Sequence, residues 1–209
     1  MTSYKQTALF SRRRQMGARL TDRSGWQTAA SFTSAQEEMA QVTTNAGLSD
    51  VSWMTKVDLK GAGVHALAAL DARSRSWSLG SAHLLVTCDP EARDSVLAQV
   101  SSADGVSVTE VTSVFAQFVL AGPRGRDILR KLTSLNVSEV ALPDLGCGQT
   151  SLAHVHGSIV LRQDLGSLPA FHILAPRDYG EDVWDSLLHA GHEFHLAPFG
   201  CEAFEALGR

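Results

Sequence analysis

Residues 47–61, GLSDVSWMTKVDLKG, decide how this sequence folds. Apolar residues alternate with polar ones at every second position: Val51, Trp53, Val57 and Leu59. This period of two predicts a β-strand over 51–59 with one buried face, and Thr55 adds a β-branched residue on the apolar side. Met54 breaks the pattern, because it lies on the face that otherwise carries serine, lysine and aspartate. The reason for a methionine there bears on whether the chain binds a small molecule.

The residues around this strand indicate a mixture of helices and strands. Upstream, Ser34 and Glu37 have the S-x-x-E spacing of a capping box, which predicts that a helix begins there. Gly47 is expected to end that helix in the left-handed conformation. Downstream, we expect a short helix within residues 62–74, a strand over 82–88, and a helix that begins at Asp89-Pro90.

Strands and helices also alternate in the second half of the chain. The expected elements are strands over 106–112 and 115–122, a helix over 122–135, a hairpin over 150–163 that turns at Gly157, a strand over 169–176 and a helix over 177–191. The predicted class is α+β, with mixed or antiparallel sheets and helices packed on one face. The 209 residues are expected to form a single unit. Its length also allows this unit to consist of two closely packed α+β halves, of about 1–105 and 106–209.

Composition and charge exclude several classes of protein. The net charge is −4, with both signs spread along the chain, so no basic surface for nucleic acid is expected. The three cysteines have no CxxC spacing, which argues against disulfides and a zinc knuckle and favours a cytoplasmic protein. No apolar stretch approaches the roughly 20 residues that cross a bilayer, so no membrane association is expected. The arginine-rich start has the charge bias of a transit peptide, but it lacks a sustained amphipathic repeat and is interpreted as a surface arm.

The short motifs give little support for nucleotide, hydrolase or metal chemistry. Neither a phosphate-binding glycine loop nor a G-x-S-x-G elbow occurs. Histidines do recur at spacings that could hold a metal: His154, His156, His189, His192 and His195. Gly191 breaks the helix under the last three, so their side chains are not expected to converge, and no metal site is predicted. Arg162 and Asp164 could form an acid–base pair near a hairpin end, although such charges more often protect a strand edge.

Longer motifs carry a resemblance to a known family. GARLTDRSGW at 17–26 and SAQEEMAQVTTNAGLSDVSWMTKVDLKG at 34–61 closely resemble the N-terminal part of the aminomethyltransferase (T protein) of the glycine cleavage system. Later segments are similar to further stretches of that family: FVLAGPRGRDIL at 118–129, FHILAPRDYGEDVWDSLLHAG at 171–191 and FGCEAFEAL at 199–207. The resemblance covers nearly the whole chain and implies the folate-binding fold of this family.

The chain also departs from the family pattern. Only DARSRSWSLGS at 71–81 stands where full-length members carry an acidic pair whose aspartate acts at the folate amine. LGSLP at 165–169 stands in place of the family's Y-T-G-E signature and lacks its glutamate. The sequence ends where the C-terminal barrel of the family would begin, so that barrel is expected to be absent. These departures make the chain look most like the small γ subunit of heterotetrameric sarcosine oxidase.

The resemblance implies tetrahydrofolate as the cofactor and a role in one-carbon metabolism. By this resemblance, the folate pocket of this chain is expected to be lined by Met54, Val86 and Thr87, and Arg162 is expected to contact an anionic group of the ligand. The expected partner is a larger flavoprotein or a methyltransferase subunit, within a complex that demethylates, oxidises or transfers methyl groups. No catalytic residue is assigned.

Two other interpretations stay open at this level. The chain could be a non-catalytic structural subunit that has lost the folate site, in which case Met54 fills a gap in a strand that is covered on both sides. It could also be a stand-alone tetrahydrofolate-dependent methyltransferase that uses a different acid, Asp58 or Asp164.

Overall fold

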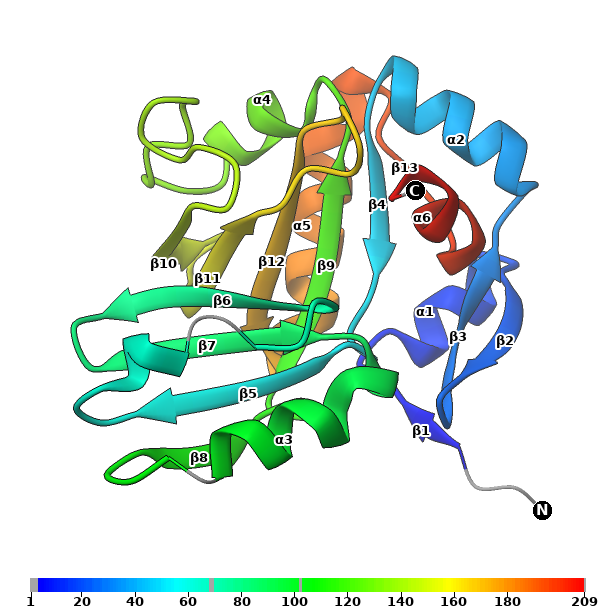
Figure 1. Ribbon diagram of the computed structural model, residues 1–209. Helices are drawn as coiled ribbons and strands as arrows, with labels where there is room; N and C mark the ends of the chain where they lie inside the picture. The colour runs from blue at the N-terminus through cyan, green and yellow to red at the C-terminus, as the bar shows by residue number, and fades with distance from the viewer. Residues whose placement is uncertain (1–3, 68–69, 102, 209) are drawn as a thin grey trace.

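The computed structural model describes residues 4–67, 70–101 and 103–208 and arranges them in three β-sheets with surrounding helices (Figure 1). Sheet A contains, in spatial order, β1 (Lys5–Gln6), β3 (Trp26–Ser31) and β2 (Arg19–Arg23). Sheet B contains β10 (Cys147–Leu152), β11 (Val155–Arg162), β12 (Ala170–Pro176), β9 (Phe115–Ala121), β4 (Gly47–Asp50) and β13 (Ala197–Pro198). Sheet C contains β6 (Ser74–Gly80), β7 (His83–Cys88), β5 (Thr55–Lys60) and β8 (Ser107–Glu110).

Short helices connect and cover these sheets. The α-helices are α1 (Phe10–Gln15), α2 (Ala35–Thr44), α3 (Arg93–Ser101), α4 (Gly125–Arg130), α5 (Gly180–Gly191) and α6 (Cys201–Leu207). The 3₁₀ turns are η1 (Val64–Leu67), η2 (Pro90–Ala92), η3 (Arg177–Tyr179) and η4 (His192–Phe194). No helix in the described ranges is long and apolar enough to span a bilayer.

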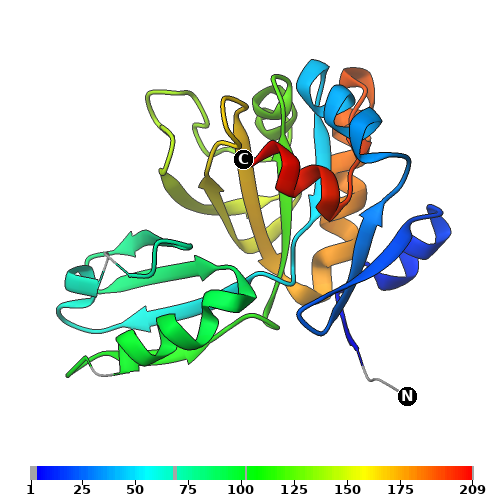
Figure 2. The ribbon, with the colours of Figure 1, turned by 45° about the vertical axis from the view of Figure 1, so that its right-hand side comes forward.

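Sheet B lies between two layers of helix. Its strands pair antiparallel except β13, which runs parallel to β4. Helix α5 covers one face, where Trp184 meets Phe118 of β9 edge-on with 5.4 Å between ring centroids. Helix α6 packs on the other face, where Ala203 joins Val119 of β9 in an apolar cluster, and Figure 2 shows α6 crossing in front of this sheet. These mixed and antiparallel sheets with packed helices confirm the predicted α+β class.

Sheet C is covered on both faces. On one side, Val57 of β5 and Val86 of β7 join Val96 of α3 in an apolar cluster. On the other side, Leu85 of β7 joins Leu161 of β11, so sheet C packs directly on sheet B. Successive residues of one strand point to opposite faces. Within β5, and likewise within β7, adjacent residues therefore face α3 and sheet B in turn.

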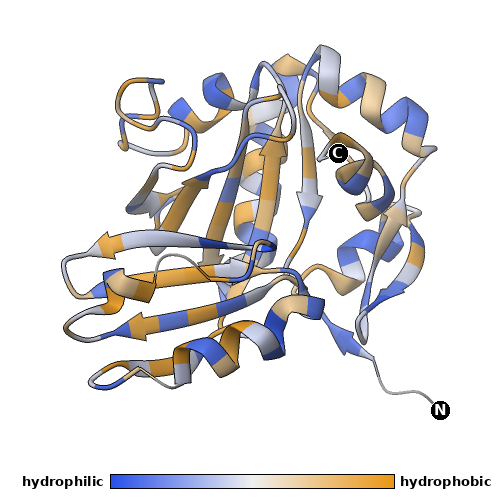
Figure 3. Ribbon diagram, viewed as in Figure 1, coloured by the Kyte–Doolittle hydropathy of each residue, from blue (hydrophilic) through white to orange (hydrophobic). Residues whose placement is uncertain are grey.

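The strand predicted over 51–59 does not form as one element, and residues 47–61 instead divide among three. They supply β4 to sheet B, a turn at 51–54, and β5 to sheet C. Figure 3 shows the alternation of apolar and polar residues along β5, but its polar face is not a solvent face, because Lys56 is fully buried. The prediction of one strand with a single buried face is therefore wrong. The error arises because alternation cannot distinguish a face that meets water from one that meets a second sheet.

The capping box of α2 is confirmed, whereas the role predicted for Gly47 is wrong. The Ser34 hydroxyl accepts from the Glu37 backbone N–H at 3.2 Å, and the Ser34 N–H donates to the Glu37 carboxylate at 3.2 Å. The helix ends at Thr44, and Gly47 begins β4. A Cβ at Gly47 would lie 2.4 Å from Cγ2 of Val42, so this glycine permits close packing of the strand on the helix.

Other differences concern short elements. The expected helix within 62–74 is reduced to η1, and its positions 68–69 lie outside the described residues. Strand β6 was not expected, because its serines and arginine hide the alternation. The hairpin of β10 and β11 is present, but it turns at Ala153 and His154, which both have positive φ, rather than at Gly157.

Candidate functional site

A cavity of about 340 Å³ lies where residues of all three sheets and of α6 come together. Sheet A contributes Arg23, sheet B contributes His172, and sheet C contributes Thr87. Helix α6 contributes Phe204, and the turn before β5 contributes Met54. The volume falls within the range of roughly 300–1,000 Å³ that is typical of small-molecule sites. We call this space the central cavity.

The structure brings two of the four predicted ligand-binding residues to this cavity. Met54 and Thr87 line it. Val86 is fully buried on the α3 face of sheet C and does not line it, because adjacent residues of β7 point to opposite faces. The strict alternation of a strand could have shown that Val86 and Thr87 do not share a pocket.

Arg162 is buried beside the cavity, and its guanidinium is hydrogen-bonded to other groups of the chain. Its guanidinium donates to both carboxylate oxygens of Asp164, at 3.0 and 2.9 Å, and to the carbonyl of Leu142 at 3.1 Å. The hydrogen bond to Asp164 raises the pKa of Arg162. Asp164, rather than Arg162, lines the central cavity. Arg162 therefore lies next to the site with each guanidinium nitrogen bonded within the chain, which differs from the predicted contact with an anionic ligand group.

Three side chains form a polar cluster at the wall of the cavity. The amide nitrogen of Gln117 lies 3.0 Å from Nδ1 of His172 and 3.8 Å from Sδ of Met54. Within the described residues, Nε2 of His172 and Oε1 of Gln117 are buried and have no hydrogen-bond partner. Burial, and then the charge of Lys56, lowers the pKa of His172 to about 4, so its ring is neutral at pH 7.

Lys56 holds the turn that presents Met54. Its fully buried amine donates to the carbonyls of Ser52 at 3.0 Å and Met54 at 2.7 Å. No carboxylate of the described chain lies within ion-pair distance of this amine. Burial lowers the pKa of Lys56 to about 7, and the charge of Asp50 opposes that shift. The backbone position of Met54 therefore depends on a lysine that sequence alternation assigns to a solvent face.

We expect the stability of the protein to rise between pH 7 and pH 10 because of Lys56. The folded state loses the proton near pH 7, whereas an unfolded lysine loses it near its ordinary value of 10.5, so the unfolded state binds more protons in between. We compare wild type with Lys56→Met by the difference between their free energies of unfolding. This difference should increase in favour of wild type by on the order of a few kcal/mol over this pH range. Urea unfolding at several pH values measures it. Lys60→Met, at the exposed end of the same strand, is the control. Parallel curves for wild type and Lys56→Met would contradict the assignment.

Charged side chains surround the mouth of the central cavity. Arg23 forms an ion pair with Glu205 and lies over the Trp53 ring, 4.7 Å from its centroid. Burial raises the pKa of Asp89, and the charge of Arg23 opposes that rise. Arg75 donates to backbone carbonyls and has no ion-pair partner among the described residues. The cavity thus combines the apolar side chains of Met54, Leu165 and Phe204 with hydrogen-bond donors and acceptors.

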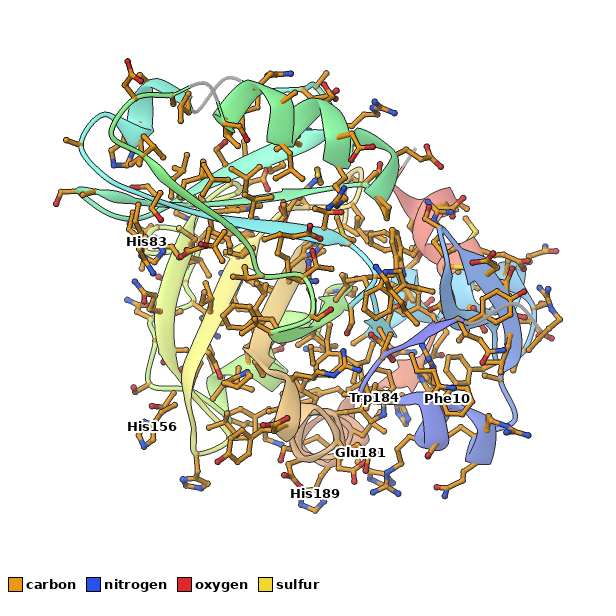
Figure 4. All side chains as sticks on the ribbon, turned by 90° about the horizontal axis from the view of Figure 1, so that it is seen from below. Phe10, His83, His156, Glu181, Trp184 and His189 are labelled. Atoms are coloured by element: carbon orange, nitrogen blue, oxygen red, sulfur yellow. The ribbon has the colours of Figure 1, made fainter. Side chains whose placement is uncertain are left out.

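The histidines do not form a metal site within the described part of the chain, where no group of three or more His, Cys, Asp or Glu is placed to hold an ion. Helix α5 ends at Gly191, and His195 has a left-handed backbone with φ of 55°. Figure 4 shows Trp184 directed from α5 into the core, whereas Glu181 and His189 lie on the outer side of the helix. In the same view His156 is on the exterior and well apart from His83 of sheet C.

Sequence reasoning missed most of the cavity. Arg23, His172, Phe204 and Glu205 all line it and were not proposed as site residues. Phe204 lies in one of the segments that carry the family resemblance, so its motif was an available signal. The other positions are far apart along the chain, and only the packing of sheets A and B with α6 brings them together.

Comparison with known proteins identifies the family to which this chain belongs. A model of the GCVT N-terminal domain matches residues 76–208. The chain belongs to this family. This confirms the predicted relationship to aminomethyltransferases. The aminomethyltransferase of Acidobacterium capsulatum is 25% identical over 236 residues, which cover 97% of this GCVT-family chain and 61% of the relative. The chain thus spans about three-fifths of the length of that enzyme.

Two solved structures show how far the GCVT-family fold extends. The glycine cleavage system aminomethyltransferase T from Bartonella henselae superposes with a TM-score of 0.79 at 16% identity, covering 99% of this chain and 62% of that one. A chain of heterotetrameric sarcosine oxidase from Corynebacterium sp. U-96 gives a TM-score of 0.60 at 20% identity, covering 77% of this chain and 92% of that one. At these identities the likeness describes the fold.

Proposed function

We propose that the central cavity binds a tetrahydrofolate-type cofactor, and that the chain works as a subunit or partner of a larger enzyme of one-carbon metabolism. The observation that carries this proposal is the composition of the cavity wall. Met54 and Phe204 offer apolar contact for a flat ring, and the unpartnered nitrogen of His172 offers a hydrogen bond to its edge. Most buried polar atoms in proteins are hydrogen-bonded, so an unpaired nitrogen of a side chain that lines a cavity supports a ligand there.

The residues present fit such a cofactor. Asp89 and Glu205 line the same cavity and can accept hydrogen bonds from ring N–H and amino groups. When bound, tetrahydrofolate supplies a nitrogen that accepts or donates a one-carbon unit. The chain would hold the ring between Met54 and Phe204, orient it through His172 and Asp89, and keep water away from the reacting nitrogen. Its contribution to catalysis is therefore positioning.

The proposed partner is a larger flavoprotein or methyltransferase subunit that produces or consumes the one-carbon unit. The shared fold with a chain of heterotetrameric sarcosine oxidase, of which 92% is covered, supports a role inside a complex. The three cysteines are free thiols, which suits the reducing cytoplasm that we propose as its location.

A non-catalytic structural subunit is the second candidate, and one observation favours it. Each guanidinium nitrogen of Arg162 donates to Asp164 or Leu142 and Arg162 does not line the cavity, so the predicted anion contact requires a rearrangement. A stand-alone methyltransferase is less well supported. Asp58, one of its proposed acids, is bound by Lys60 at 2.8 Å and by His83 at 2.5 Å and does not line the cavity.

Titration with tetrahydrofolate tests the proposal. Ligand at a hundred times its dissociation constant should raise the free energy of unfolding by about 2.7 kcal/mol, measured by urea unfolding or as a shift in Tm. Met54→Ala should weaken binding about tenfold, or about 1.4 kcal/mol, because it removes an apolar contact to the ring.

Met39→Ala is the matched control, since Met39 is also partly buried in the α6-side apolar cluster but does not line the cavity. It should reduce stability without changing affinity. Equal losses of affinity in the two variants would show that Met54 makes no specific contact with the ligand. The absence of any tetrahydrofolate-dependent stabilisation in wild type would leave the structural subunit as the better interpretation.

A further inference from the structure

We infer that His172 selects the ligand of the central cavity by offering it a single N–H donor, so that a ring with a carbonyl oxygen binds and the same ring with an amino group is rejected. This inference rests on the proposed function, because it names the edge of the cofactor ring that the cavity reads. It concerns a residue on β12 for which the sequence suggested no role.

The tautomer of His172 follows from the Gln117 amide. The side-chain nitrogen of Gln117 faces two acceptors, Nδ1 of His172 at 3.0 Å and Sδ of Met54 at 3.8 Å. In this orientation both N–H groups of the amide have an acceptor, Nδ1 of His172 and the thioether sulfur of Met54, and Oε1 is the amide atom without a partner. Nδ1 of His172 is then an acceptor, and the single ring proton sits on Nε2.

That Nε2–H group is a buried donor without an acceptor. His172 is only 3% exposed, and Nε2 has no hydrogen-bond partner in the part of the chain that the structure describes. Most buried donors are paired, because leaving one unpaired costs free energy. The same side chain lines the central cavity, so a bound ligand can supply the missing acceptor. Because burial keeps the ring neutral at pH 7, it presents one donor and no net charge.

Flexible neighbours give a ligand access to this nitrogen. Phe204 stands edge-on to the His172 ring, with 6.4 Å between centroids and 74° between planes. Met54 touches the same Gln117 amide and is only partly buried. A methionine side chain changes rotamer at little cost, so a ring that enters the cavity can displace it and reach Nε2. This gives Met54 a role at the site beyond filling space.

The pterin ring of tetrahydrofolate carries a carbonyl oxygen at position 4, and this oxygen is a pure acceptor. Tetrahydroaminopterin differs by an amino group at that position, which points N–H donors toward the same partner. Two donors facing each other leave at least one buried and unpaired, and sites built for a hydrogen bond reject such analogues strongly. We therefore expect wild type to bind tetrahydrofolate at least tenfold more tightly than tetrahydroaminopterin.

Three variants test the assignment by calorimetric titration with both ligands. His172→Leu should weaken tetrahydrofolate about tenfold and reduce the preference to less than threefold. His172→Gln can turn either its nitrogen or its oxygen to the ligand, so both compounds should bind with little preference. Gln117→Leu frees the tautomer of an intact His172 and should also reduce the preference, which identifies Gln117 as a positioning residue. A Tm for each variant reports folding separately.

The outcomes separate this inference from the proposed function. Equal affinity of wild type for the two ligands, or an unchanged preference in His172→Leu, would overturn the role of His172 while leaving folate binding intact. Failure of wild type to bind either ligand would overturn both. Because the wild-type comparison needs no substitution, a variant that does not fold still leaves the inference open to refutation.

Discussion

Arg13→Met is expected to lower the free energy of unfolding by about 3–5 kcal/mol, which is a large part of the stability of a domain of this size. Arg13 lies in α1 and is 1% exposed. Its guanidinium forms an ion pair of 3.1 Å with Asp50 and donates to the backbone carbonyl of Gln27 at 2.8 Å. Removing it leaves the buried carboxylate of Asp50 without its ion-pair partner, with only the more distant amine of Lys56 as a nearby positive charge.

Asp50 connects this ion pair to the turn at the site. Its carboxylate also accepts from the hydroxyl of Thr7 at 2.6 Å, and from the hydroxyl and the backbone N–H of Ser52 at 2.6 and 3.0 Å. Ser52 belongs to the turn that Lys56 holds and that presents Met54 to the cavity. The loss of Arg13 should therefore affect the site as well as overall stability.

The neighbouring arginine provides a matched control for this prediction. Arg12, in the same helix, pairs with Asp185 near the surface, with 41% of its side chain exposed. Arg12→Met should cost less than about 1 kcal/mol, because exposed ion pairs contribute little. In the double variant Arg13→Met/Asp50→Asn the uncompensated charge is gone, so the loss should be smaller than for Arg13→Met alone. Urea unfolding of the three variants measures these differences. Equal losses for Arg12→Met and Arg13→Met would show that the buried pair has no special importance.

Gly200→Ala is expected to destabilise the fold by about 3 kcal/mol and to weaken any ligand of the central cavity. A Cβ at Gly200 would lie 2.1 Å from the backbone oxygen of Ala30 in β3, and a backbone atom cannot swing away as a flexible side chain can. Gly200 immediately precedes α6, and its N–H donates to the buried carboxylate of Glu38 at 2.9 Å. The substitution should push α6 away from sheet A and break this bond.

The expected effect on ligand binding follows from the position of α6. This helix supplies Phe204 and Glu205 to the cavity wall, so a shift of its first turn displaces both. Gly125→Ala in α4 is the control, since Gly125 does not line the cavity and its nearest contact, the backbone oxygen of Leu120 at 3.5 Å, is an ordinary one. Tetrahydrofolate titration and urea unfolding of both variants check the prediction. A Gly200→Ala variant as stable as Gly125→Ala would show that the close contact of Gly200 with β3 is not needed for folding.

Local sequence patterns determined the elements of this protein and its family. The capping box at Ser34, the apolar run of β12 and the helical spacing of α5 were each read from residues close together in the chain. Such patterns work because hydrogen bonds within a helix turn and alternation along a strand depend on neighbouring residues only. The long motifs near residues 17–61 likewise identified the family.

The site depended on tertiary structure. Alternation correctly separated the two faces of β5 and β7, but it did not say that the polar face packs on sheet B. For that reason Lys56 was predicted to be exposed, whereas the grouping of Val86 with Thr87 overlooked the alternation itself. The cavity is lined by residues from 23 to 208, and no local pattern encodes their proximity. The hydrogen-bond partners of Arg162 and His172 and the position of α6 likewise depend on tertiary packing. Local patterns thus determined several helices and strands, among them α2, β12 and α5, and the family to which they belong. The packing of three sheets alone decided which polar side chains are buried, paired or left with an unused hydrogen bond, because burial is a property of what lies opposite a residue in space.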